Sequence, residues 1–289
     1  MYRKHMDKMR SRREDSNKGD YGRVFVVAGS TGMTGAAYLA SQAALRSGSG
    51  LVVNGVPDLL NPIMEIKLTE VITLPLPEGK KKLGCLGIRA LKPVLEYSNK
   101  CDVVALGPGL GSFSETQRLA RELTKRIEKP LVLDADGLNA IGDKLAYLRK
   151  RKYPTVITPH PGEMSRLIKK DIAFIQANRE QAAKDLAKDT GAVVCLKGSR
   201  TVVASNDGQF YVNETGNSGM ATGGTGDVLT GMIASFIGQG LDPFGATVTA
   251  VYIHGLAGDI AAQKKGPFSM IASDLLEYFP QAFEKAGLY

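Results

Sequence analysis

Short apolar runs alternate with segments of helical periodicity along this chain, and glycine-rich or polar stretches separate them. A short apolar run is typical of a buried strand, whereas apolar positions three and four residues apart indicate an amphipathic helix. Strands are therefore predicted at residues 24–28, 51–56, 103–106, 131–133, 156–157 and 192–196, and helices at 36–46, 115–127, 226–238, 243–264 and 271–286. This alternation predicts an α/β fold with a mostly parallel central sheet and helices on both faces.

A hairpin is predicted after the last of these strands. Apolar segments 201–204 and 210–212 flank the turn sequence SNDG at 205–208, and Asn, Asp and Gly are favoured in tight hairpin turns. The hairpin should add an antiparallel edge to the sheet. The sequence contains no repeat or linker, so we expect one domain over residues 20–289, preceded by a flexible basic arm over residues 1–19.

Glycine-rich or polar stretches follow five of the predicted strands. They occupy residues 29–35, 107–111, 134–139, 158–163 and 197–201. In an open parallel sheet, ligands bind outside the carboxyl ends of the strands. The sequence therefore predicts a binding site along that edge.

In the segment from Thr215 to Gly238, five glycines precede one carboxylate, Asp227, at the start of a predicted helix. Glycines leave backbone N–H groups open to a ligand, and a helix start adds unpaired donors and the positive end of its dipole. Together they predict an anion site, most often for phosphate. No GK[ST] follows the glycines, which excludes a Walker loop. The simpler alternative is a tight turn with Asp227 as a helix cap.

A formal net charge of +8 is compatible with nucleic-acid binding. Residues 1–19 hold seven Lys or Arg against three Asp or Glu, so this arm carries half of the surplus. The other basic clusters, at 80–82 and 149–152, lack the interleaved aromatic residues of a surface that binds single strands. We therefore expect no nucleic-acid partner. Surplus positive charge also suits a polyanionic small substrate.

The cellular location follows from what the sequence lacks. No apolar run reaches the roughly 18 residues that a membrane span needs, and the N-terminus has no apolar core of a secretion signal. Cys85, Cys101 and Cys195 are widely spaced and lie near apolar segments, so we expect reduced core thiols and not a metal site. A cytoplasmic enzyme without a membrane partner is predicted.

These motifs, in this order, resemble the ADP/ATP-dependent NAD(P)H-hydrate dehydratases, a carbohydrate-kinase-related family of the ribokinase-like superfamily. The matching segments are VVAGSTGMTGAAYLASQAALRSGSGLV, ALGPGLG, LVLDADGLNAI, TPHPGE, CLKGSRTVV and NSGMATGGTGDVLTG. The resemblance implies a ribokinase-like three-layer α/β/α fold. Some members carry an additional epimerase domain, and this chain resembles the dehydratase part alone.

The resemblance also implies a reaction. ADP or ATP, with Mg²⁺, would phosphorylate the C6 hydroxyl of hydrated NADH or NADPH; phosphate would then leave and the ring double bond would return. Standalone bacterial and archaeal members favour ADP, and the family suggests a homotetramer. Two alternatives stay open. One is a kinase of a small alcohol that stops at the phosphorylated product; the other is a non-catalytic protein that senses nucleotides or binds nucleic acid.

Asp227 is the candidate general base and a substrate contact, because a carboxylate there can take the proton of an attacking hydroxyl. Backbone N–H groups of the segment before it should bind the transferred phosphoryl group. By resemblance, a second segment holds the rest of the nucleotide, and its lysine is a cation suited to phosphate. The nucleotide-binding candidates are Lys197, Gly198, Ser199, Arg200, Thr201, Gly224, Thr225 and Gly226. The alternative for Lys197 is an ordinary lysine at a strand end.

The resemblance places the hydrated dinucleotide against Gly35, Ala36, Ala37, Gly109, Gly111 and His160. Asp136, Asn139 and Glu163 are candidates for orienting substrate or Mg²⁺-bound water. No residue is assigned as a direct metal ligand, because Mg²⁺ keeps several waters. The alternative is that the small residues form only tight turns and that His160 is a core histidine. His254, on a predicted apolar helix, is expected to be a packing residue.

Overall fold

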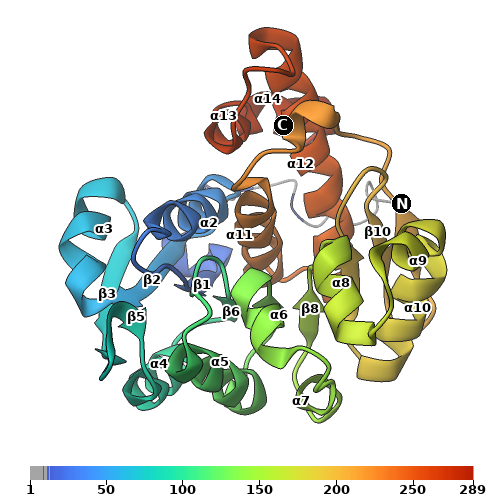
Figure 1. Ribbon diagram of the computed structural model, residues 1–289. Helices are drawn as coiled ribbons and strands as arrows, with labels where there is room; N and C mark the ends of the chain where they lie inside the picture. Colours follow the sequence, from blue (N-terminus) through green and yellow to red (C-terminus); the bar gives the residue numbers. More distant parts are fainter. Residues whose placement is uncertain (1–8, 10–11, 13, 289) are drawn as a thin grey trace.

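A nine-stranded sheet forms the centre of the computed structural model, which describes Met9, Arg12 and residues 14–288 (Figure 1). Its order is β11-β10-β9-β8-β7-β6-β1-β2-β3, and all neighbours are parallel except β9–β10 and β10–β11. The strands are β1 (Arg23–Val27), β2 (Leu51–Pro57), β3 (Ile72–Leu76), β6 (Val103–Leu106), β7 (Leu131–Leu133), β8 (Thr155–Ile157), β9 (Val193–Leu196), β10 (Val202–Ala204) and β11 (Phe210–Val212). The predicted parallel sheet and its antiparallel edge hairpin are both confirmed.

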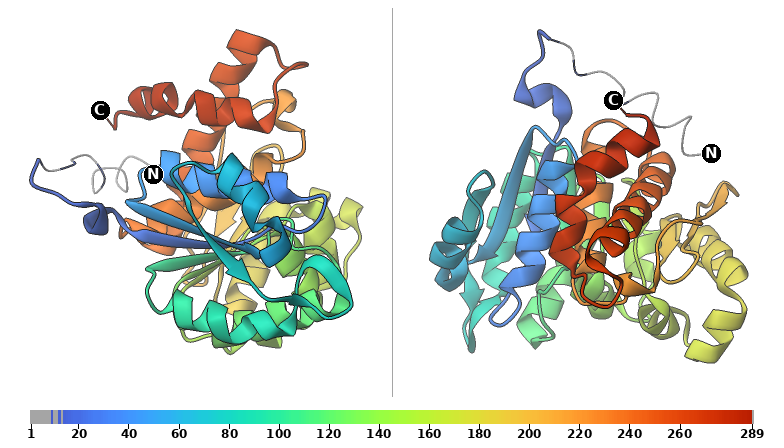
Figure 2. Two further views of the ribbon diagram at one scale, coloured as in Figure 1. Left: turned by 90° about the vertical axis from the view of Figure 1, so that its left-hand side faces the viewer. Right: turned by 90° about the horizontal axis from the view of Figure 1, so that it is seen from above.

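Helices cover both faces of this sheet, as the side view in Figure 2 shows. One face carries α2 (Thr34–Arg46), α3 (Asn61–Lys67), α11 (Thr225–Gly238), α12 (Pro243–Lys265), α13 (Ala272–Glu277) and α14 (Phe279–Ala286). The other carries α4 (Leu91–Ser98), α5 (Ser114–Arg126), α6 (Ala135–Ile141), α7 (Ala146–Arg149), α8 (Pro161–Ile168), α9 (Ile172–Ala177) and α10 (Arg179–Thr190). Successive side chains of β1 point to opposite faces of the sheet, so Val24 and Val26 lie in one core and Phe25 and Val27 in the other. The three-layer prediction is confirmed.

Smaller elements complete the described chain. They are the 3-10 helices η1 (Lys18–Tyr21), η2 (Asp58–Leu60), η3 (Ile88–Ala90) and η4 (Ser218–Met220), and a two-stranded sheet of β4 (Glu78–Gly79) and β5 (Lys82–Leu86). Most of the predicted flexible arm, residues 1–19, lies outside the described residues, so its flexibility stays a prediction. Within the described residues, no helix combines the length and the apolar character that crossing a bilayer requires.

The five glycine-rich or polar stretches meet at one edge of the sheet. Strands β1, β6, β7, β8 and β9 are consecutive parallel neighbours, so the residues that follow them emerge side by side. Backbone hydrogen bonds join adjacent exits: the amide of Gly29 donates to the Pro108 carbonyl at 2.9 Å, and that of Lys197 to Pro159 at 2.8 Å. The predicted common edge is therefore present.

The C-terminal helix expected over 271–286 is wrong as one element, because the structure divides it into α13 and α14 at Tyr278. Pro280 explains the break. Proline lacks the N–H that would continue the helix, and its ring clashes with the preceding turn. Proline is tolerated in the first turn of a new helix, which is where Pro280 lies in α14.

The crossing of α2 and α11 depends on Gly231. A β-carbon built at this position would lie 2.0 Å from the Ala40 carbonyl oxygen and 3.0 Å from Ala43 Cβ. The two helix backbones therefore approach each other more closely than any side chain allows. Because α11 begins at the predicted anion site, this contact also fixes where that site lies above the sheet.

We expect Gly231→Ala to lower the free energy of unfolding by up to about 2 kcal/mol, since overpacking costs about 1–3 kcal/mol and the gain in helix propensity offsets about 1 kcal/mol of that cost. Denaturant unfolding measures the change. Gly35→Ala is the matched control, because that helical glycine has open space where a β-carbon would lie. Equal stability of Gly231→Ala and the unmodified protein would contradict the close approach.

Candidate active site

A buried ion pair links the ends of strands β7 and β9. Lys197 Nζ lies 2.6 Å from Asp134 Oδ1. The second Asp134 oxygen accepts a hydrogen bond of 2.8 Å from Thr230 Oγ1 of α11, and Asp134 is 1% exposed. Burial opposes the charged form of Lys197, but the negative charges of Asp134 and Glu163 outweigh it and raise the pKa of Lys197. Lys197 is therefore a fixed cation at the carboxyl edge of the sheet.

The first turn of α11 presents backbone N–H groups beside this cation. Within the described part of the chain, the amides of Thr225, Gly226 and Asp227 have no hydrogen-bond acceptor. Gly226 lies against the lysine, since a β-carbon there would be 3.2 Å from Lys197 Nζ. Unpaired amides, the positive end of the helix dipole and a cation converge at one point, which is the arrangement that binds phosphate.

Gly224, the residue before α11, occupies a position that only glycine fits. Its φ of 96° lies in the left-handed region. A β-carbon there would lie 2.4 Å from Leu39 Cδ1 and 3.0 Å from Ala272 Cβ. The turn that opens α11 is thus held between α2 and α13.

Asp227 lies in the same first turn, half-buried. Among the described residues, its carboxylate has no hydrogen bond or ion pair. Burial and the negative charge of Asp134 raise the pKa of Asp227 to about 7; Lys197 opposes the shift, and Asp136 and Glu163 add to it. A carboxylate without an internal partner and with a pKa near neutrality is suited to act as a general base.

His160 precedes α8 and caps it with its own ring. Nδ1 accepts hydrogen bonds from the amides of Gly162 at 3.0 Å and Glu163 at 3.3 Å, and Glu163 Oε2 accepts one from the His160 amide at 2.8 Å. Burial and the charges of Lys197 and Arg166 lower the pKa of His160. The ring is therefore neutral, with its proton on Nε2. Burial, against the effect of Lys197, raises the pKa of Glu163 to about 7.

Asp136 and Asn139 form a hydrogen-bonded row beside these residues. Asp136 Oδ2 accepts from the Gly111 amide at 2.7 Å, and Oδ1 from Asn139 Nδ2 at 3.2 Å. Asn139 Oδ1 in turn accepts from Arg166 Nη2 at 2.8 Å. The row connects the exits of β6, β7 and β8. Each oxygen of Asp136 therefore already accepts one hydrogen bond within the protein.

The start of α2 meets the loop after β6. Gly109, with a φ of 60°, lies against Ala36, because a β-carbon on it would be 2.9 Å from Ala36 Cβ. Ser30 Oγ donates a hydrogen bond of 2.8 Å to the Gly109 carbonyl. Gly35 is exposed and Ala36 half-buried, whereas the Ala37 side chain is fully buried. Ala37 as a whole is 0% exposed, so neither its side chain nor its backbone is available to a ligand.

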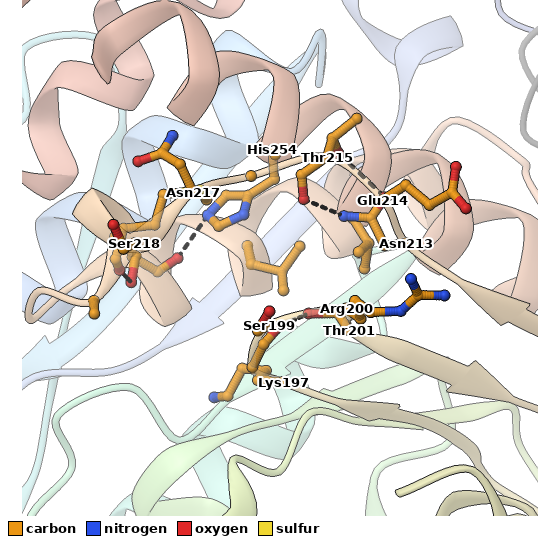
Figure 3. A pocket seen from close by; sticks show the side chains of 18 of the residues that line it. Lys197, Ser199, Arg200, Thr201, Asn213, Glu214, Thr215, Asn217, Ser218 and His254 are labelled. Atoms are coloured by element: carbon orange, nitrogen blue, oxygen red, sulfur yellow. Dashed lines mark hydrogen bonds between the residues drawn. The ribbon is translucent and has the colours of Figure 1, made fainter. Parts of the chain in front are cut away.

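A cavity of about 410 Å³ borders the N-terminus of α11. Seven of the predicted nucleotide-binding residues line it: Lys197, Gly198, Ser199, Arg200, Thr201, Thr225 and Gly226. Figure 3 shows Lys197 and Ser199 on one side of this cavity and Asn217 and His254 on the opposite side. Gly224 and Asp227 do not line the cavity, although both adjoin Thr225 and Gly226, which do.

Several residues of this site were not predicted from the sequence. Asp134 directly follows a buried strand, and that position was the one available signal. Asp259 accepts hydrogen bonds of 3.0 Å from the Gly216 amide and from Asn217 Nδ2, both in the loop that borders the cavity. These partners are more than 40 residues away in sequence, so no spacing pattern connects them. His254 was expected only to pack, yet it lines the cavity.

The described residues contain no group of three His, Cys, Asp or Glu side chains arranged to hold a metal ion. The three cysteines are free and buried, and burial raises the pKa of each thiol. They are core residues, as expected.

Comparison with known proteins gives a consistent result. Residues 24–281 match the family described as NAD(P)H-hydrate dehydratase. The chain is 49% identical to the bifunctional NAD(P)H-hydrate repair enzyme of Moorella thermoacetica over 93% of its own length and 51% of that relative. It is 37% identical to the ADP-dependent (S)-NAD(P)H-hydrate dehydratase of Neisseria meningitidis, over 92% of this chain and 85% of the relative. The chain thus spans about half the length of the bifunctional relative.

Solved structures agree with the fold. The ADP/ATP-dependent NAD(P)H-hydrate dehydratase of Bacillus subtilis, co-crystallised with ATP and Mg²⁺, superposes with a TM-score of 0.83 at 29% identity, covering 99% of this chain and 97% of the other. A ribokinase-like superfamily protein of Enterococcus faecalis gives a TM-score of 0.80 at 25% identity, covering 98% and 95%. The fold is ribokinase-like, and the chain belongs to the NAD(P)H-hydrate dehydratase family.

Proposed function

We propose that this protein dehydrates (6S)-NAD(P)H hydrate at the expense of ADP or ATP and so restores NADH or NADPH. One observation carries the proposal: unpaired amides and a fixed cation line a cavity of about 410 Å³, and an unpartnered carboxylate lies in the same helix turn. Phosphoryl transfer needs a donor site, an anion site and a base, in that spatial order. Family membership supports the same reaction.

The nucleotide occupies the cavity in this proposal, with its terminal phosphoryl group at the first turn of α11. Charge on that group is stabilised by the amides of Thr225 and Gly226 and by Lys197. Because Asp134 holds Lys197 in place, the cation needs no rearrangement when the nucleotide binds. Ser199, Arg200 and the other members of the 197–201 loop contact the remaining phosphates and the nucleoside.

The hydrated dinucleotide approaches from the Asp227 side. Its C6 hydroxyl transfers its proton to Asp227 while the oxygen bonds to phosphorus, and AMP leaves ADP, or ADP leaves ATP. In the second step the C6–O bond breaks and phosphate departs with its electrons. The ring nitrogen stabilises the positive charge at C6, and loss of a proton from C5 forms the C5–C6 double bond. The C6 oxygen leaves as part of phosphate and the C5 proton leaves separately, so atoms and charges balance.

The remaining candidates contact the substrate. Small residues at the start of α2 and in the loop after β6 allow the substrate to come close to the backbone. They are Gly35, Ala36, Gly109 and Gly111. Neutral His160 can donate Nε2–H to the dinucleotide. With its pKa near neutrality, Glu163 can accept a hydrogen bond in its charged form.

Magnesium is proposed to arrive with the nucleotide phosphates. Mg²⁺ is commonly held by substrate phosphates and waters, with few protein ligands. The donor set fits that role: Asp136, Asn139 and Glu163 offer oxygen atoms that are partly engaged within the protein and so suit contacts through water. When bound, the ion would neutralise phosphate charge.

A cytoplasmic location and a homotetrameric assembly are also proposed. Three free, buried cysteines support a reducing compartment such as the cytoplasm. A homotetramer follows only from the family resemblance, and light scattering would measure it. No nucleic-acid partner is proposed.

The decisive experiment incubates the protein with NADH hydrate or NADPH hydrate and either ADP or ATP. Recovery of reduced-nicotinamide absorbance together with released phosphate supports the dehydratase. Accumulation of a stable phosphoester would support the alternative of a small-alcohol kinase. Binding of DNA without nucleotide turnover would support the non-catalytic alternative.

Asp227→Asn should retain nucleotide binding and lower kcat by at least about 10², the usual contribution of a general base. Steady-state rates with NADH hydrate measure the loss. Asp171→Asn is the control, because Asp171 caps α9 by accepting a hydrogen bond from the Phe174 amide at 2.6 Å, and asparagine caps equally well. Activity of Asp227→Asn within threefold of the unmodified enzyme would exclude Asp227 as the base.

The rate should fall on acidification through a pKa of about 7, because protonated Asp227 cannot accept the hydroxyl proton. A pH profile of kcat/KM measures this acidic limb. In Glu163→Gln the limb should move to lower pH, since one of the negative charges that raise the pKa of Asp227 is removed. A profile that is flat through neutrality would contradict the assignment.

Lys197→Met should raise the KM of the nucleotide more than that of the hydrate, because it removes the cation beside the anion site. This variant also leaves Asp134 buried without a partner, which is destabilising. The double variant Lys197→Met/Asp134→Asn removes both charges and should show the same preference. A larger increase in the KM of the hydrate, in either protein, would refute the placement of the nucleotide.

A further inference from the structure

One side chain from α12 reaches the peptide unit that opens α11. His254 Nε2 lies 2.9 Å from the Thr225 carbonyl oxygen, and His254 is 8% exposed. Burial lowers the pKa of His254 to about 4, so the imidazole is neutral near pH 7. A carbonyl oxygen can only accept, so Nε2 carries the proton and donates it.

This hydrogen bond acts on the amide that follows. The carbonyl of Thr225 and the N–H of Gly226 belong to one planar peptide unit, so fixing the oxygen also fixes the direction of the hydrogen. The Thr225 hydroxyl is anchored separately, within 3.1 Å of the carbonyl oxygens of Met220 and Thr222. His254 is therefore the side chain that sets the tilt of the Thr225–Gly226 peptide.

We propose that His254 is a positioning residue that aims the Gly226 N–H at the transferred phosphoryl group. The inference rests on the proposed function, because that amide is one of the donors of the anion site. A correctly aimed donor matters most when charge on the phosphoryl oxygens is greatest, which is in the transition state. A ring that served only to fill space would need no donor at this atom.

The rest of the loop is held independently of His254. Thr215 Oγ1 donates a hydrogen bond of 2.9 Å to the Tyr252 carbonyl, and Asp259 binds Gly216 and Asn217. A β-carbon at Gly258 would lie 2.3 Å from the sulfur of Met220, so α12 and the loop are in direct contact. Losing the His254 hydrogen bond should consequently leave the cavity intact and disturb one peptide.

Two substitutions distinguish a His254 side chain that orients the Gly226 N–H from one that only fills space. His254→Leu removes the donor, and His254→Gln keeps an N–H donor that can reach the same carbonyl. We expect His254→Leu to lower kcat about tenfold or more, with the KM of the nucleotide changed less than twofold, and His254→Gln to recover most of kcat. Thr249→Val is the matched control on α12, because its buried hydroxyl has no partner, and it should keep full activity.

Thermal unfolding of each variant shows whether a loss of kcat reflects unfolding. The inference is overturned if His254→Leu is folded and keeps kcat within twofold, if the nucleotide KM rises in place of the kcat loss, or if His254→Gln is no better than His254→Leu.

A second measurement does not depend on turnover. The chain has three histidines, so ¹⁵N-histidine labelling gives a simple NMR spectrum in which His254→Gln identifies the signals of His254. We expect a neutral ring protonated on Nε2 at neutral pH, and protonation on Nδ1 would overturn the inference. If the unmodified enzyme did not act on NAD(P)H hydrate, the proposed function would fail, while the NMR result would still decide the His254–Thr225 contact.

Discussion

The ion pair between Asp134 and Lys197 is the interaction on which the site depends. Two charges removed from water are tolerated only when they are paired and hydrogen-bonded. Here the pair joins the exits of two strands, and Thr230 ties it to α11. One contact thereby fixes three elements that meet at the carboxyl edge of the sheet. Desolvation of the two charges is unfavourable, but the pairing holds a cation at a defined position next to α11, whose first turn forms the candidate anion site.

The same charges govern the candidate base. Asp134 raises the pKa of Asp227 and Lys197 opposes the increase. The carboxylate that holds Lys197 in place therefore also helps to bring the pKa of Asp227 near 7. Glu163 and Asp136 contribute to the same field. The pKa of Asp227 therefore depends on charges along the whole carboxyl edge of the sheet. A substitution at any of these positions changes the electrostatics of the others.

Elements that depend on residues close together in sequence could be predicted from the sequence. Buried parallel strands such as β1 and β6 are continuous apolar runs, and the turn after β10 carries hairpin residues, so both were predicted. Strand β3 contains Pro75 and lies at the sheet edge, where such a residue is tolerated but obscures the pattern. The glycines and Asp227 were visible because an anion site needs them close together in sequence. Asp259 and His254 were not visible as site residues, since their roles come from partners brought near only by folding.

The turn at Gly224 is held between Leu39 of α2 and Ala272 of α13, and this contact has a consequence for biosynthesis. Every strand of the main sheet lies within residues 23–212, which leave the ribosome first. Leu39 of α2 emerges with these strands, whereas Ala272 of α13 emerges well after them. A nascent chain can thus build its sheet while the catalytic turn still lacks one of its supports. The candidate anion site can therefore be complete only after Ala272 has emerged from the ribosome.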